Sequence, residues 1–251
     1  MKIGIPTAVL FLHAFPLNSK MYQFQFKALE ENNIPYIAYD YFGFGSRNNF
    51  PTDYSIETLT DAIVSELTEL GVKKVIPVGD SMGGYIMFDL WRRYRELIKG
   101  LVFVSTRAEA DTDEGKKSRY ATIEKIKKEG KDFLIDFMLD AQVSPKTKEN
   151  KEKMKLLECI MNEATEEGII KALKALAERK DNTEILNSIN VPTLVIAGED
   201  DEKITPPSIV RKIADGIPNA KFITIPNSAH LPPFENADEF NRVLVQFLKG
   251  I

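Results

Sequence analysis

A serine with a glycine two residues away on each side is the first feature of this sequence that could carry out chemistry. Residues 79–84 read Gly-Asp-Ser-Met-Gly-Gly, and the serine in this stretch is Ser81. The apolar run at residues 75–79 predicts a buried strand, and a helix is expected to begin at Met82. A serine on a sharp turn from strand to helix projects its hydroxyl into open space, and neighbouring glycines leave room for that turn. The segment therefore predicts a nucleophilic serine.

A nucleophilic serine needs a base, and the sequence contains only two histidines, His13 and His230. His230 lies after the last predicted strand and before the last predicted helix, in a loop that can carry it over the end of a sheet. We therefore expect His230 to accept the proton of the Ser81 hydroxyl. His13 lies near the other end of the chain, after the first apolar run.

An acidic group must also hold the imidazole in the correct tautomer. Residues 199–202 read Glu-Asp-Asp-Glu and follow an apolar run at residues 193–198. The chain order of serine, acid and histidine is the order typical of a nucleophile turn of this kind. The spacing leaves both Asp200 and Asp201 open as the orienting acid.

These residues must be positioned by regular elements, and short apolar runs rich in β-branched and aromatic side chains recur along the chain. They predict six strands at residues 8–13, 36–40, 75–79, 100–105, 193–198 and 221–225. Helical spacing is found at residues 56–70 with Ser55 as N-cap, and at 82–95, 206–214 and 237–248. The alternation of strands and helices predicts an α/β fold, with a mainly parallel sheet covered on both faces.

The alternation stops in the middle of the chain, where lysine, glutamate, leucine and methionine dominate. We expect residues 1–106 and 190–251 to form a core domain and residues 107–189 to form an all-helical cap inserted before the acid-bearing strand. Met154, Leu157 and Met161 recur at helical spacing, as expected for the packed face of one such helix. An insertion at this point can close the mouth of a sheet, so we expect a lid over the pocket.

Together these motifs resemble those of the α/β-hydrolase superfamily, especially its serine carboxylesterase, non-haem haloperoxidase and C–C hydrolase branches. The similarity covers nearly the whole chain except the helical insertion. It implies the α/β-hydrolase fold and, through a Gly-x-x-Asp motif beginning at Gly198, assigns Asp201 as the orienting acid with Asp200 as the alternative. It also implies an oxyanion hole formed by the backbone N–H groups of Phe15 and Met82.

Two further segments share this resemblance. Residues 12–16 read Leu-His-Ala-Phe-Pro and resemble the family's His-Gly-x-Pro turn, with Ala14 in place of the commoner glycine. The resemblance implies that His13 braces this loop and moves no protons. Residues 40–46 read Asp-Tyr-Phe-Gly-Phe-Gly-Ser and resemble an Asp-x-x-Gly-x-Gly loop, for which an architectural role is expected.

Asp80 and Cys159 are alternative nucleophiles that the sequence argues against. Relatives that remove halides use an aspartate, but Asp80 lies one residue before the centre of the turn, and Met82 stands where those relatives carry a halide-binding tryptophan. Cys159 lies in the helical insertion with no histidine nearby, and we expect it to be packed.

Composition excludes several other classes of function. A net charge of −4 offers no excess of positive charge for a nucleic acid. No stretch approaches the roughly 20 apolar residues of a membrane span, and the single cysteine cannot form an internal disulfide. We expect a cytoplasmic monomer or homodimer without a cleaved leader, whose partner is a small molecule and neither nucleic acid nor membrane.

The expected activity is that of a carboxylesterase, which cleaves small hydrophobic carboxylic esters through an acyl-enzyme on Ser81, with no cofactor and no metal. The Phe, Leu and Met content of the insertion indicates a hydrophobic pocket. Other activities of the same fold remain open, namely C–C bond hydrolase, enol-lactonase, thioesterase and perhydrolase. A capped ligand receptor with weak hydrolase activity is an alternative of a different class.

Overall fold

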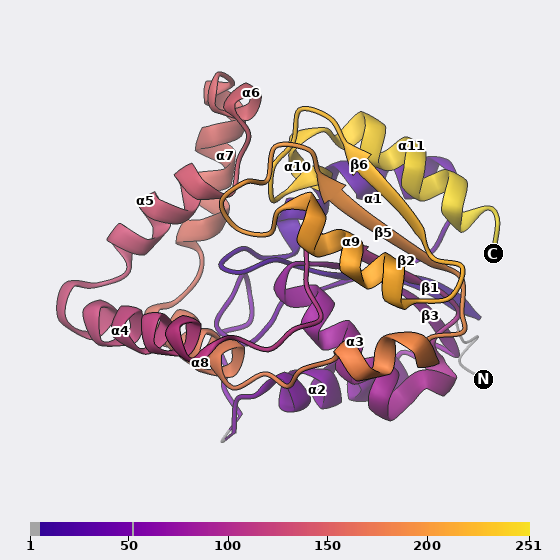
Figure 1. Cartoon of the computed structure of the whole chain (residues 1–251), viewed down its shortest axis with the longest axis horizontal. Coiled ribbons are helices and arrows are strands. Elements are labelled where there is room, and N and C mark those ends of the chain that lie inside the picture. The colour runs from indigo at the N-terminus through magenta and orange to yellow at the C-terminus, as the bar shows by residue number, and fades with distance from the viewer. Residues whose placement is uncertain (1–5, 52) are drawn as a thin grey trace.

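The computed structural model describes residues 6–51 and 53–251, with a parallel β-sheet at its centre (Figure 1). The strands lie in the order β2-β1-β3-β4-β5-β6, and each is parallel to its neighbours. They are β1 (Thr7–Leu12), β2 (Tyr36–Tyr39), β3 (Lys74–Asp80), β4 (Leu101–Val104), β5 (Thr193–Gly198) and β6 (Lys221–Ile225). The predicted α/β fold is confirmed, and each strand end lies within one residue of its predicted position.

Helices cover the sheet on both faces. One layer contains α1 (Gln23–Glu31), α10 (Pro232–Glu235) and α11 (Ala237–Leu248), and another contains α2 (Ile56–Glu69), α3 (Met82–Tyr94) and α9 (Pro207–Gly216). Short 3₁₀ helices lie at Ser19–Tyr22, Arg95–Leu97 and Thr183–Ser188. The Ser55 side chain accepts a hydrogen bond from the Thr58 N–H and caps α2, as the sequence predicts.

The segment between β4 and β5 is helical, as expected. It contains α4 (Asp113–Glu129), α5 (Asp132–Ala141), α6 (Pro145–Lys148), α7 (Lys151–Asn162) and α8 (Glu166–Ala177). Figure 1 places α4, α5, α6 and α7 to one side of the sheet. The end of the segment returns to the core, because Trp91 Nε1 on α3 donates to Ser188 Oγ at 2.9 Å. Its movement as a lid stays a prediction.

Cys159 is exposed, so the prediction that it is packed is wrong. Helix α7 buries Leu157, Ile160 and Met161, and at 3.6 residues per turn Cys159 lies outside that face. The prediction relied on the usual burial of cysteine and neglected the position of this residue on its helix.

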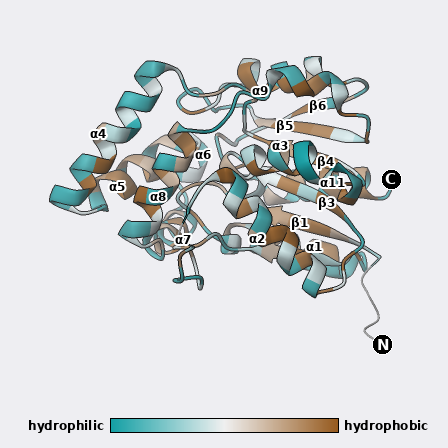
Figure 2. Cartoon of the chain, turned by 90° about the horizontal axis from the view of Figure 1, so that it is seen from below, coloured by the Kyte–Doolittle hydropathy of each residue, from teal (hydrophilic) through white to brown (hydrophobic). Residues whose placement is uncertain are grey.

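Burial follows the pattern of a parallel sheet covered on both sides. Every residue of β4 and β5 is buried, whereas the edge strand β6 is buried only at Ile225. Figure 2 shows the same distribution, with apolar residues concentrated on the inner strands and polar residues on the outward sides of helices such as α4. In the described part of the chain, no helix is long and apolar enough to cross a membrane.

The topology brings the predicted site residues to one edge of the sheet. Because all strands are parallel, their carboxyl ends lie together, and ligands of open α/β sheets bind beyond these ends. His13 follows β1, Ser81 follows β3, Asp201 lies beyond β5, and His230 lies beyond β6. Residues from distant parts of the chain therefore meet above the sheet.

Candidate active site

Ser81 occupies a strained turn between β3 and α3. Its φ of 50° and ψ of −106° lie in a region that residues with a side chain rarely adopt. Hydrogen bonds hold this conformation: the Ser81 N–H donates to Val104 O at 2.9 Å, and the Thr106 hydroxyl donates to Ser81 O at 2.8 Å. The Ser81 side chain is partly exposed. The turn therefore presents the hydroxyl above the sheet.

Close backbone packing explains the glycines around Ser81. A Cβ atom on Gly83 would lie 2.2 Å from Leu12 O, and one on Gly79 would lie 2.6 Å from Gly83 C. These contacts are with main-chain atoms, which cannot rotate away. Glycine is therefore required at both positions for α3 to begin so close to β1 and β3.

The Gly83→Ala substitution is expected to lower the free energy of unfolding by about 1–3 kcal/mol, because the new methyl group must push α3 away from β1. Gly115→Ala in α4 is the matched control, since its Cβ would meet the nearest atoms of Asp111 at 3.4 Å. In that helix, alanine should stabilise the protein by about 0.5–1 kcal/mol. Urea unfolding of both variants measures the difference, and equal stabilities would show that the close approach at Gly83 is not required.

The structure brings His230 and Asp201 together. His230 Nδ1 donates to Asp201 Oδ2 at 2.7 Å, and both side chains are fully buried. Asp201 also accepts hydrogen bonds from the N–H groups of Ile204 and Thr205. Burial opposes ionisation of Asp201, but the imidazole and these N–H groups outweigh it and lower the pKa of the carboxyl. Asp200, the alternative acid, is exposed.

The second ring nitrogen of His230 is left available. Its Nε2 atom is buried and has no hydrogen-bond partner among the described residues. With Nδ1 protonated toward Asp201, the neutral ring carries its lone pair on Nε2. No hydrogen bond joins Nε2 to the Ser81 hydroxyl in this structure, although both residues line the same cavity. Catalytic hydrogen bonds are often long or poorly aligned before substrate binds.

Two positioning residues that the sequence did not reveal hold the His230 loop. Glu235 Oε1 accepts from the N–H groups of Ala229 and Leu231, on either side of His230, at 2.7 and 3.2 Å. The His230 N–H donates to Gln142 O at 3.0 Å, and Gln142 Nε2 donates to Phe15 O at 2.7 Å. Gln142 therefore links the His230 loop to the predicted oxyanion loop.

Phe15 and Met82, the residues expected to form the oxyanion hole, both line the cavity beside Ser81. Met82 is the first residue of α3, where an N–H has no acceptor within the helix. No acceptor for the Phe15 N–H is found among the described residues. Neither N–H group therefore has an acceptor among the described residues, and an oxyanion hole at this place stays a prediction. Ala14 is accommodated in the turn with its N–H donating to Met21 Sδ at 3.3 Å.

His13 has the surroundings of a bracing residue. Its Nδ1 donates to Ala14 O at 3.0 Å, and its Nε2 accepts from the Tyr41 N–H at 3.2 Å. Burial lowers the pKa of His13 to about 4, even though the bond to Ala14 and the charge of Asp40 oppose that change. Asp40 in turn accepts from the Ser19 N–H at 2.8 Å. These contacts join the loops after β1 and β2.

Asp80 lies outside the cavity wall, as its place before the turn indicates. Its side chain is fully buried, and neither carboxyl oxygen has a hydrogen-bond partner among the described residues. Burial, together with the nearby carboxylates of Asp201 and Glu235, raises the pKa of Asp80 well above its usual range. Asp80 is absent from the cavity that Ser81 and His230 line.

The cavity beside Ser81 has a volume of about 150 Å³, and both the sheet end and the helical segment contribute to it. Phe15, Met82 and Tyr85 supply apolar surface. The polar part of the wall was not predicted. It consists of Arg107, Asp111, Arg119, Gln142, Arg179 and Thr205.

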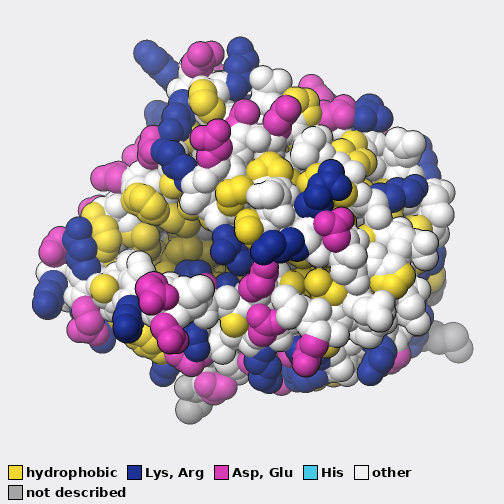
Figure 3. All heavy atoms as spheres, viewed as in Figure 1, with side chains coloured by type: hydrophobic (Ala, Val, Ile, Leu, Met, Phe, Trp, Pro, Cys, Tyr) yellow, Lys and Arg dark blue, Asp and Glu magenta, His cyan; other side chains and the backbone are white. Residues whose placement is uncertain are grey.

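An apolar groove of about 290 Å³ adjoins this cavity and shares Phe15, Arg119 and Met138 with it. Leu134, Phe137 and other apolar residues of the helical segment line the groove. Figure 3 shows the hollow on this face, lined largely by hydrophobic side chains with basic side chains at its margin. The groove provides an apolar surface that leads from solvent toward Ser81.

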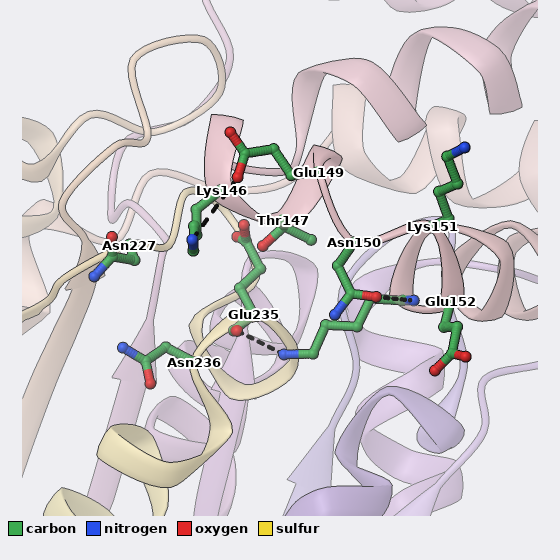
Figure 4. Close-up of a pocket in the computed structure, with 10 residues that line it drawn as sticks. Lys146, Thr147, Glu149, Asn150, Lys151, Glu152, Asn227, Glu235 and Asn236 are labelled. Carbon is green, nitrogen blue, oxygen red and sulfur yellow. Dashed lines mark hydrogen bonds and ion pairs between the residues drawn. The ribbon is translucent and has the colours of Figure 1, made fainter.

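A larger groove of about 750 Å³ lies elsewhere, between α6, the start of α7 and the loop around Asn236 (Figure 4). Its lining is polar, and Figure 4 shows the ion pair of Lys146 with Glu149. Lys153 Nζ also donates to Glu235 O at 2.8 Å. Among the residues that the structure describes, neither a histidine nor a serine contributes to its lining. The larger groove therefore lacks the residues of the candidate active site.

Comparison with known proteins gives consistent results. The profile described as alpha/beta hydrolase fold matches residues 7–237. A thermophilic esterase from Thermogutta terrifontis, solved with malate bound, is 31% identical with a TM-score of 0.93, covering 98% of this chain and 91% of that one. The AB hydrolase superfamily protein YisY of Bacillus subtilis is 28% identical over 98% of this chain and 92% of its own. A bifunctional esterase/perhydrolase of Acinetobacter calcoaceticus is 23% identical over 96% of this chain and 91% of its own.

Proposed function

The chain belongs to the alpha/beta hydrolase family, and from this premise we propose that it is a serine hydrolase that cleaves carboxylic esters. The observation that carries the proposal is that Ser81, on its strained turn, shares one cavity with His230, whose other ring nitrogen is bonded to Asp201. This arrangement provides a nucleophile, a base and an orienting acid. The 31% identical esterase supports the choice of an ester as substrate.

In the proposed mechanism, Ser81 Oγ attacks the ester carbonyl carbon while His230 Nε2 takes the hydroxyl proton. The carbonyl oxygen becomes negative and accepts hydrogen bonds from the backbone N–H groups of Phe15 and Met82. The tetrahedral intermediate then releases the alcohol, which takes the proton from His230, and the acyl group remains on Ser81. Water then attacks the acyl carbon while His230 Nε2 takes a proton from it. His230 returns this proton to Ser81 Oγ as the bond between Oγ and the acyl carbon breaks, which releases the carboxylic acid and restores Ser81.

The dimensions of the site favour short acyl chains. The cavity of about 150 Å³ accommodates few heavy atoms beside Ser81, and the apolar groove offers space for the rest of the substrate. We expect kcat/KM to fall by about tenfold or more between 4-nitrophenyl butyrate and the decanoate, because a long chain does not fit the cavity. A series of 4-nitrophenyl esters measures this, and labelling by a fluorophosphonate tests for an activated serine. Absence of both turnover and labelling would rule out the proposed function.

A second candidate activity is perhydrolysis, in which hydrogen peroxide takes the place of water in attacking the acyl-enzyme and a peracid is released. The similarity to the bifunctional esterase/perhydrolase favours this candidate, as does that to a non-heme chloroperoxidase of Kitasatospora aureofaciens, 28% identical over 96% of this chain and 91% of its own. Assay of peracid formation from acetate and peroxide would distinguish it from ester hydrolysis alone.

A further inference from the structure

Three arginines, Arg107, Arg119 and Arg179, line the small cavity beside Ser81, and among the described residues Asp111 is the one acidic residue that lines it with them. We propose that this cavity binds a carboxylate of the substrate, so that the protein prefers short esters that also carry a free carboxylate. This inference rests on the proposed ester hydrolysis and specifies its substrate class. The charges come from separate parts of the chain: Arg107 follows β4, Arg119 lies on α4, and Arg179 follows α8.

Arg107 is the first reason for the proposal. Its half-buried guanidinium donates to Ile204 O at 2.6 Å, and no carboxylate among the described residues pairs with it. A guanidinium group has five N–H donors, so most of the Arg107 donors have no partner among the described residues. A half-buried cation without a counter-ion is unfavourable, and an anionic ligand would supply that counter-ion.

Arg179 is the second reason for the proposal. Its side chain is 2% exposed, with Nη1 donating to Asp111 Oδ1 at 2.5 Å and the guanidinium lying 4.4 Å from the centre of the Tyr85 ring. Its Nε atom is buried and has no hydrogen-bond partner among the described residues. Asp111 is also bonded to Arg119. One carboxylate therefore pairs with two arginines. Burial alone would raise the pKa of Asp111, but the two arginines outweigh it and lower this pKa.

Other acidic groups near the cavity do not supply the missing negative charge. Glu109 is paired with Lys212 at 3.0 Å, and Asp201 is bonded to His230. The cavity wall thus keeps an excess of positive charge on partly buried side chains, and charge-assisted hydrogen bonds to such groups are strong. A planar carboxylate matches the planar guanidinium fork, and the volume of about 150 Å³ requires it to lie a few bonds from the ester.

Matched ester pairs test the proposal. On the acyl side, monoethyl succinate is compared with ethyl succinamate, in which a neutral amide replaces the carboxylate. On the alcohol side, 3-acetoxypropanoate is compared with 3-acetoxypropanamide. With hydrolysis followed in a pH-stat, we expect kcat/KM to favour the carboxylate at least about tenfold in one pair, and that pair shows which side of the ester carries the charge.

Arg107→Gln should lower this carboxylate-to-amide ratio by about 10- to 100-fold, because glutamine can still donate to Ile204 O but has no charge. Arg107→Lys should retain part of the preference. Arg242→Gln is the matched control, since Arg242 is an exposed residue of α11 paired with Glu239. Its ratio should equal that of the wild type. High salt should also reduce the preference of the wild type.

The outcomes separate this inference from the proposed function. If kcat/KM is the same for the carboxylate and the amide in both ester pairs, or if Arg107→Gln leaves the carboxylate-to-amide ratio unchanged, this inference is wrong. The proposed ester hydrolysis would still stand. If no ester is hydrolysed, calorimetric titration of the Ser81→Ala protein with monoethyl succinate and with ethyl succinamate decides the question. Tighter binding of the carboxylate supports the anion site, and equal or absent binding overturns it. Circular dichroism spectra verify that each variant is folded.

Discussion

Replacing Ser81 by alanine is expected to lower kcat for ester hydrolysis by on the order of 10⁴-fold or more, because no other group can form the acyl-enzyme. The Ser81 hydroxyl makes no hydrogen bond to a described residue, so its loss removes little folding energy. The melting temperature should therefore stay close to that of the wild type. Initial rates with 4-nitrophenyl butyrate and fluorophosphonate labelling measure the effect.

Ser65→Ala is the matched control for this prediction. Ser65 is exposed on α2 and takes no part in the cavity, so the variant should hydrolyse esters and react with the fluorophosphonate as the wild type does. Substantial turnover by Ser81→Ala would show that the nucleophile has been assigned wrongly. Loss of activity in both variants would point to an effect of the assay or of purification.

The strands could be predicted from sequence because each is a short apolar run bounded by polar residues. This signal is local and arises from the burial of both faces of the sheet, as in β4 and β5. Helix α1 was not predicted. Phe24 and Phe26 alternate as in a strand, and Gln25 is buried because its Nε2 donates to Pro233 O and to Asn241 Oδ1, both distant in sequence. Tertiary contacts here outweigh the local pattern.

The proposed nucleophile and base could be picked out from the sequence because a strand, a turn and a helix lie consecutively around Ser81, and because the chain contains only two histidines. The arginines of the cavity were not accessible. Arg107, Arg119 and Arg179 look like ordinary surface residues in a chain with many charged side chains, and only the folded segment brings them to one cavity. The expectation of a hydrophobic pocket describes the adjoining groove better than the cavity beside Ser81.

The contacts of Glu235 also could not be predicted from the sequence. In the sequence it is one of many acidic residues, with no feature that separates it from Asp238 or Glu239. In the structure it is buried and accepts hydrogen bonds from the backbone N–H groups of Ala229 and Leu231, the two neighbours of His230. Its role depends on a return of the chain over the His230 loop, which residue spacing does not reveal.

The Asp201→Asn substitution is expected to lower kcat by on the order of 10⁴-fold, as happens when an asparagine in a triad favours the wrong imidazole tautomer. An asparagine also cannot accept all the bonds that the carboxylate receives from His230, Ile204 and Thr205. Asp200→Asn is the matched control, because this exposed neighbour differs by one position and does not contact the ring. It should retain nearly full activity.

The pKa of Asp201 adds a test by pH. Because this pKa is lower in the folded protein than the ordinary value of about 3.9, the charged carboxylate stabilises the fold above that value. The contribution is lost as pH falls through the lowered pKa. The difference in free energy of unfolding between wild type and Asp201→Asn should therefore be largest near neutral pH and should shrink below about pH 4. Near-normal turnover by Asp201→Asn, with Asp200→Asn inactive, would instead assign the orienting role to Asp200.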